Sequence, residues 1–114
     1  MTVNLKTLIK AVPFKEETRQ DLLKRLDSLT ETQKIDLSDT CWAVLAQMYF
    51  ARLRYEKGKL MLEIQQGKRE FNKQDFEEVK EKITKQFAKR LKSVQTEESI
   101  EQIRQKLQQQ VRKK

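Results

Sequence analysis

Apolar residues recur at helical spacing along almost the whole chain and divide it into successive amphipathic segments. The spacing predicts helices over residues 3–12, 16–28, 31–66, 73–93 and 97–112. Pro13 ends the first of these, and Thr30 with Gln33 matches a capping box at the start of the third. Asn72 is placed to cap the fourth. As an alternative, residues 59–71 would form a hairpin, although they do not alternate as strands do.

The third predicted helix contains the most apolar stretch of the chain, residues 41–53. A helix that is apolar nearly all round must be surrounded by other helices. We therefore expect an all-α fold, an antiparallel helical bundle of four to five helices with one long central helix. That helix would be about 54 Å long at 1.5 Å per residue, so we expect a bend or break at Ser38 and Asp39 or at Gly58.

Helical spacing also assigns most aromatic side chains to the core. These are Trp42, Tyr49, Phe50, Phe76 and Phe87. A buried tryptophan or tyrosine needs a hydrogen-bond partner for its polar atom. Cys41 is the only cysteine and lies in the most apolar stretch, so we expect a small buried side chain and a reducing compartment.

The chain has 114 residues with two glycines and one proline, which fits a helical protein with few tight turns. We assign residues 1–95 to a helical bundle domain and residues 96–114 to a basic C-terminal helix that docks on the bundle or binds a partner. The apolar stretch is too short to span a membrane, and lysines interrupt the N-terminal segment where a secretory signal needs an apolar core. We expect a cytoplasmic protein that does not bind membranes.

The formal net charge is +8, and the excess lies in the second half of the chain. Residues 1–40 hold seven basic and seven acidic side chains, residues 41–72 hold six and three, and residues 73–114 hold twelve and seven. Such asymmetry suggests an acidic partner, of which nucleic acid is the commonest. The same charge also serves solubility.

The chain contains no histidine, which removes catalytic triads, imidazole metal ligands and side chains that titrate near neutrality without a shift. Paired carboxylates such as Glu16 and Glu17 fall near predicted helix starts, where the helix dipole explains them. Neither glycine stands in a phosphate-loop motif. We expect no enzyme activity, no cofactor and no metal. A site built from carboxylates or a lysine alone is the third hypothesis.

Two groups of basic residues are candidates for binding nucleic acid or another acidic partner. The first interleaves cations with an aromatic ring in the central helix and consists of Arg52, Arg54, Tyr55, Lys57 and Lys59. The second is a row on the fourth predicted helix and consists of Lys85, Lys89 and Lys92. Both have an ordinary explanation, because Tyr55 would also fit the edge of the core and the lysines would also form a solvated face.

The last predicted helix carries a narrow apolar stripe of coiled-coil spacing, formed by Ile100, Ile103, Leu107 and Val111. Two outcomes are open for this stripe. The helix folds back on the first two helices, or it docks on another chain as a partner-facing element. We expect residues 108–110 and 112–114 to fray.

These observations favour a small non-catalytic binding module, or a subunit of a larger cytoplasmic assembly, that acts through protein–protein interaction. The alternative is a sequence-nonspecific RNA- or DNA-binding protein that holds phosphates on a basic helical surface. A homo-oligomer is compatible with either function.

Overall fold

The computed structural model describes residues 3–91 and 97–112, with side chains described for residues 3–91 and 98–110. This part of the chain forms α helices and one turn of 3-10 helix, with no strand. The elements are α1 (Leu5–Ala11), α2 (Glu16–Arg25), η1 (Leu26–Ser28), α3 (Glu31–Gln65), α4 (Lys73–Arg90) and α5 (Glu97–Arg112). The all-α fold predicted from the hydrophobic spacing is confirmed.

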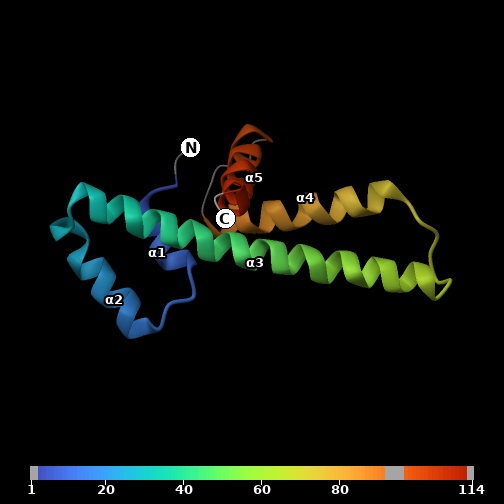
Figure 1. Cartoon of the computed structure of the whole chain (residues 1–114), viewed down its shortest axis with the longest axis horizontal. Helices are drawn as coiled ribbons and strands as arrows, with labels where there is room; N and C mark the ends of the chain where they lie inside the picture. Colours follow the sequence, from blue (N-terminus) through green and yellow to red (C-terminus); the bar gives the residue numbers. More distant parts are fainter. Residues whose placement is uncertain (1–2, 92–96, 113–114) are drawn as a thin grey trace.

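α3 is the longest element, with 35 residues in a molecule whose longest extent is 57 Å. It begins at the predicted capping box, since the side chains of Thr30 and Gln33 each accept a hydrogen bond from the other residue's backbone. The helix passes through Ser38 and Gly58 as one continuous rod (Figure 1), so the expected interruption is wrong. A glycine inside a helix costs only about 1 kcal/mol, and the burial of Leu60 offsets this cost.

α3 ends in a glycine cap. Gly67 has a φ of 75°, in the left-handed region that glycine adopts without strain. Its N–H donates to the Ile64 carbonyl at 3.1 Å, and the Lys68 N–H donates to the Glu63 carbonyl at 2.9 Å. These two bonds are the Schellman pattern of helix termination. The hairpin considered for residues 59–71 is therefore wrong.

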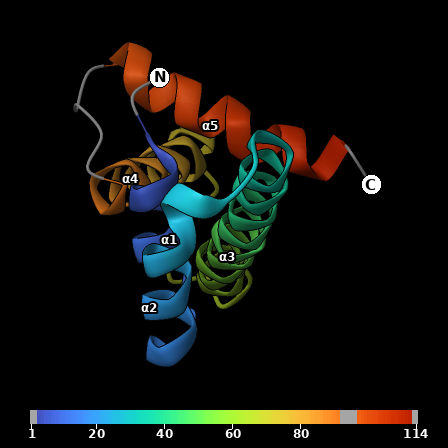
Figure 2. The same cartoon turned by 90° about the vertical axis from the view of Figure 1, so that its left-hand side faces the viewer.

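α4 runs back antiparallel to α3, and α5 crosses both helices at a steep angle (Figures 1 and 2). α1 packs against α3, whereas α2 contacts α1 and lies at the outside of the molecule (Figure 2). No residue of α2 is buried. The helices α1, α4 and α5 therefore provide most of the packing around α3, and the half-buried Leu22 and Leu23 of α2 pack at the edge of the core.

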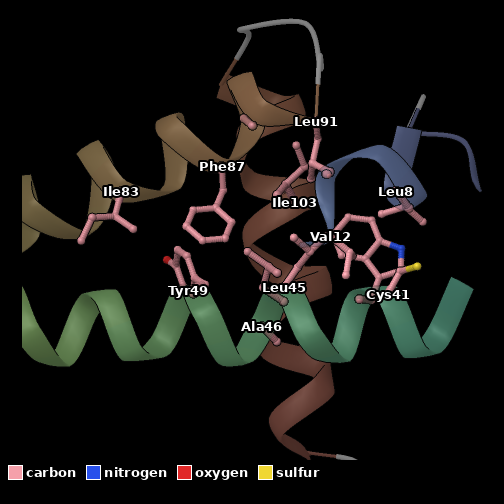
Figure 3. Packing of buried hydrophobic residues seen from close by; sticks show 14 of the residues in the cluster. Leu8, Val12, Cys41, Leu45, Ala46, Tyr49, Ile83, Phe87, Leu91 and Ile103 are labelled. Carbon is pink, nitrogen blue, oxygen red and sulfur yellow. The ribbon is translucent and has the colours of Figure 1, made fainter. Parts of the chain in front are cut away.

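The core forms where these helices meet the apolar stretch of α3 (Figure 3). From α3 it contains Cys41, Trp42, Leu45, Ala46, Tyr49 and Leu53, together with Leu60 further along the helix. At 100° per residue, the buried positions from 41 to 53 span only about 140° of the helix circumference. Gln47 and Ala51 are exposed, and Val44 and Met48 are half-buried. The expectation that other helices surround this stretch on all sides is therefore wrong for its outer side.

The Tyr49 hydroxyl lies inside this core and begins a short chain of hydrogen bonds into α4. It is 2.8 Å from Thr84 Oγ1, and Thr84 Oγ1 donates to the Lys80 carbonyl, also at 2.8 Å. A threonine hydroxyl has one hydrogen, so Tyr49 is the donor in the first bond. The Tyr49 ring also meets the Phe50 and Phe87 rings edge-on, with centroids 5.1 and 5.5 Å away. The predicted partner for a buried Tyr49 is thus present.

α5 belongs to the core of the chain. Ile103 and Leu107 are fully buried, and Ile100 is half-buried against the same cluster. The principal contacts of α5 are with α3 and α4. The last helix thus folds back on its own chain, but the first two helices, which we considered as its packing partners, are not its principal contacts. Gln110 is only 7% exposed and the helix extends to Arg112, so the expected fraying of residues 108–110 is wrong. The expected fraying of residues 113 and 114 lies outside the described residues.

Some of the predicted features lie outside the described residues. They are Lys92, the end of the fourth helix at residue 93 and the domain boundary between residues 95 and 96. Val111 is part of α5, but its side chain is also outside the described part of the chain.

The direction of the Tyr49–Thr84 bond predicts an unequal response to two conservative substitutions. Thr84→Val leaves the buried Tyr49 hydroxyl without an acceptor, which costs about 1–3 kcal/mol, whereas Tyr49→Phe removes the donor and costs about 1 kcal/mol. Urea denaturation measures both losses. The double variant is expected to be more stable than Thr84→Val alone. Equal losses in the two single variants would contradict the assigned donor.

The burial of α5 predicts that its apolar side chains stabilise the folded chain itself. Leu107→Ala is expected to lower the free energy of unfolding by about 2–5 kcal/mol, because it leaves a cavity between α5 and its neighbours. The matched change Gln109→Ala, at an exposed position of the same helix, should stay within about 0.5 kcal/mol. Thermal or urea denaturation of both variants checks this, and a stable Leu107→Ala protein would show that α5 packs elsewhere.

Candidate partner-binding surface

The basic segment of α3 follows directly after the core stretch, and its side chains divide between two faces of the helix. Arg52, Tyr55 and Lys59 fall within about 60° of one another at 100° per residue. Leu62 falls on the same side. All four side chains are exposed, and we call this set the outer face.

The outer face combines cations with accessible apolar surface. Tyr55 is 63% exposed and Leu62 is 53% exposed, so neither side chain packs in the core. The ordinary explanation, in which Tyr55 packs at the edge of the core, is therefore wrong. Lys59 Nζ lies 5.5 Å from the centroid of the Tyr55 ring, a cation–π arrangement. Arg52 pairs with Glu56 at 3.5 Å, an exposed contact that contributes little to stability. The face therefore offers charge and a ring to a partner.

The two other cations of the segment, Arg54 and Lys57, lie on a different side of α3. They line a groove of about 880 Å³ between α3, α4 and α5, and Lys80 of α4 lines it as well. Apolar side chains in the lining include Phe50 and Leu53. The remaining lining residues are Ala43, Ala46, Gln47, Gln108 and Gln110. No carboxylate occurs among the described residues that line this groove.

The lysine row predicted on α4 is a surface of mixed charge. Lys85 and Lys89 are exposed, but Glu78 and Glu81 share the same shallow depression. Lys85 Nζ lies 3.1 Å from a carboxylate oxygen of Glu81, as expected for residues four apart on a helix. The acidic neighbours reduce the positive potential of the row, which makes it a weaker candidate than the α3 segment.

The apolar stripe predicted on α5 is partly buried within the chain. Its members Ile103 and Leu107 lie in the hydrophobic core.

Sequence reasoning missed Lys80 and Gln110 as members of the groove. Lys80 follows Val79 on α4, and its position is decided by the antiparallel return of that helix. Gln110 comes three residues after Leu107, so it continues the spacing of the buried side of α5. That spacing was a usable signal, but the neighbouring glutamines made the segment resemble a frayed end.

Tyr49 and Glu101 are two titratable groups near the core whose pKa values are shifted by their surroundings. Burial raises the pKa of Tyr49, and the hydrogen bond with Thr84 lowers it in part. The pKa of Glu101 is lowered mainly by the hydrogen bond from Arg104, whose Nε lies 2.8 Å from Oε2. Tyr49 therefore stays protonated and Glu101 stays ionised. Among the described residues, no group of three or more cysteine and carboxylate side chains is placed to hold a metal ion.

Cys41 is fully buried, and burial raises its pKa to about 11 from the ordinary value of 9.0. At pH 8 this lowers the thiolate fraction about a hundredfold, in addition to blocking access. The folded protein should therefore react with Ellman's reagent at least about a hundredfold more slowly than the urea-unfolded protein. Absorbance at pH 8 follows the reaction, and comparable rates would show that the thiol is accessible.

The described helices include none that is both long enough and apolar enough to span a membrane. Comparison with known proteins leaves the family of the chain open. No family model, no curated protein and no solved structure matches it. The residues of the outer face and of the groove are thus the basis for a functional proposal.

Proposed function

We propose that this protein is a non-catalytic binding module that docks on an acidic protein partner through the outer face of α3. The observation that carries the proposal is the exposure of Tyr55 and Leu62 beside Arg52 and Lys59 on one side of the longest helix. Aromatic and arginine side chains are the types most enriched at the centres of protein interfaces. The cations would orient an acidic partner, and the two apolar side chains would supply buried area.

The shape of the molecule supports this role. α3 and α4 extend away from the core as an antiparallel pair (Figure 1), so the middle of α3 is presented to a partner without any rearrangement of the chain. A preformed rigid surface loses little conformational freedom on binding. Within this proposal the protein is a subunit of a cytoplasmic assembly, and a homo-oligomeric contact through the same face would bring like charges together.

Nucleic acid is a second candidate, favoured by the exposed Tyr55 ring between basic side chains. A ring of this kind can stack on a base while the cations hold phosphates. Leu62 on the same face favours a protein, because phosphate contacts require no aliphatic neighbour. The two candidates predict different sensitivities to salt and to nuclease.

A photo-crosslinker placed at Tyr55 tests the proposal in cells. Replacement of Tyr55 by benzoylphenylalanine is expected to give one discrete crosslinked protein that persists after nuclease treatment. The same replacement at Ile35, an equally exposed apolar position of α3, is the matched control and should give none. Adding Arg52→Glu and Lys59→Glu should reduce the crosslink about tenfold, because both cations then repel an acidic partner.

Two results would count against this assignment. A crosslink that disappears with nuclease, together with salt-dependent binding of single-stranded RNA, would establish the nucleic-acid alternative. An equal pattern of crosslinks at positions 55 and 35 would show that the outer face has no specific partner.

A further inference from the structure

The groove beside α5 has an apolar floor with the spacing of a helix-packing surface. Along α3 the floor residues Ala43, Ala46, Phe50 and Leu53 are separated by three, four and three positions. This alternation is the one by which helices pack side by side, and it covers about 15 Å of helix length. The two alanines allow another backbone to approach closely, and the half-buried Phe50 ring provides a larger contact.

The rim of the groove is positively charged. Arg54 and Lys57 form no ion pair among the residues that the structure describes. Lys80 stands on the wall formed by α4, where its charge helps to lower the pKa of Glu101. With three cations and no described carboxylate in the lining, the groove is complementary to an acidic partner and repels a second copy of this basic chain.

The wall formed by α5 contains an unsatisfied donor. Gln110 is 7% exposed, and its Nε2 atom is buried with no hydrogen-bond partner in the described part of the chain. A buried polar group without a partner costs about 1–3 kcal/mol. Gln110 lines the groove, so a rotation of its side chain would bring Nε2 to a carboxylate or carbonyl oxygen of an occupant and recover this free energy.

We infer that this groove binds an acidic amphipathic helix of a protein partner. The apolar side of that helix packs on Phe50 and Leu53, and its carboxylates pair with Arg54, Lys57 and Lys80. One side-chain oxygen accepts from Gln110. A nucleic-acid strand fits less well, because the floor is aliphatic apart from one ring and that ring already meets Tyr49 edge-on. The inference rests on the proposed function and adds a second contact region beside the outer face.

A designed peptide tests the groove directly. The probe is a fluorescent peptide of about 14 residues, with leucine at positions three and four apart and glutamate on the other side. Anisotropy should show saturable binding to the whole protein. Two control peptides, one with lysine for every glutamate and one with the leucines dispersed, should bind at least about tenfold more weakly.

Paired variants then locate the binding site on the protein. Arg54→Glu with Lys57→Glu should weaken binding of the acidic peptide at least about tenfold, whereas Arg52→Glu with Lys59→Glu on the outer face should change it less than about threefold. Gln110→Leu should raise the midpoint of thermal unfolding, since it removes an unpaired buried donor, and should still weaken the peptide complex. This opposite pair of effects separates a binding role from a purely structural one.

The outcomes distinguish the groove from the proposed function. Equal binding of all three peptides, or loss of binding only with the outer-face pair, overturns the groove while the crosslinking result at Tyr55 stands by itself. Binding of a single-stranded oligonucleotide, lost with Arg54→Glu and Lys57→Glu while the acidic peptide fails to bind, also overturns it. Selective binding of the acidic peptide without a crosslink at Tyr55 supports the groove as a helix-binding site and contradicts docking through the outer face.

Discussion

The structure depends on the burial of one side of α3 by helices that are much shorter than α3 itself. α3 has 35 residues, whereas α1, α4 and α5 have 7, 18 and 16. These three helices can cover only part of its length and circumference, and they pack on the side that carries Cys41, Leu45 and Tyr49. Inside this contact the Tyr49 hydroxyl needs an acceptor, and Thr84 of α4 supplies it. This bond specifies how α4 sits on α3 more closely than apolar packing alone.

The same mismatch in length produces the surfaces that a partner could use. Beyond the crossing of α5, α3 continues with only α4 beside it (Figure 1). Cations and apolar side chains stand exposed along its outer face. In the corner beside α5, a groove combines an apolar floor with a basic rim. Both surfaces arise without any change to the core. The residues of the outer face lie outside the core, whereas the groove shares Ala46 and Leu53 with it.

Local signals in the sequence predicted the helices well because they act within one turn. The capping box at Thr30 and the cap at Asn72 satisfy backbone donors a few residues away, so their geometry is already present in the sequence. Gly58 was a less reliable signal than these caps, because α3 continues through it without a break. A glycine inside a helix costs only about 1 kcal/mol. The burial of Leu60 on the same helix offsets this cost, and burial by a distant part of the chain cannot be deduced from a single segment.

The sequence by itself determined that the protein is all-α, where most helices begin and end, and that its centre lies within residues 41–53. Only the tertiary structure decided which side of that stretch is covered, that Ile103 and Leu107 pack within the same chain, and that Arg54, Lys57 and Lys80 meet at one groove. The physical reason is the separation along the chain over which each interaction acts. Hydrophobic period and capping act between residues up to about four apart, whereas the crossing angle of two helices depends on how distant side chains fit together.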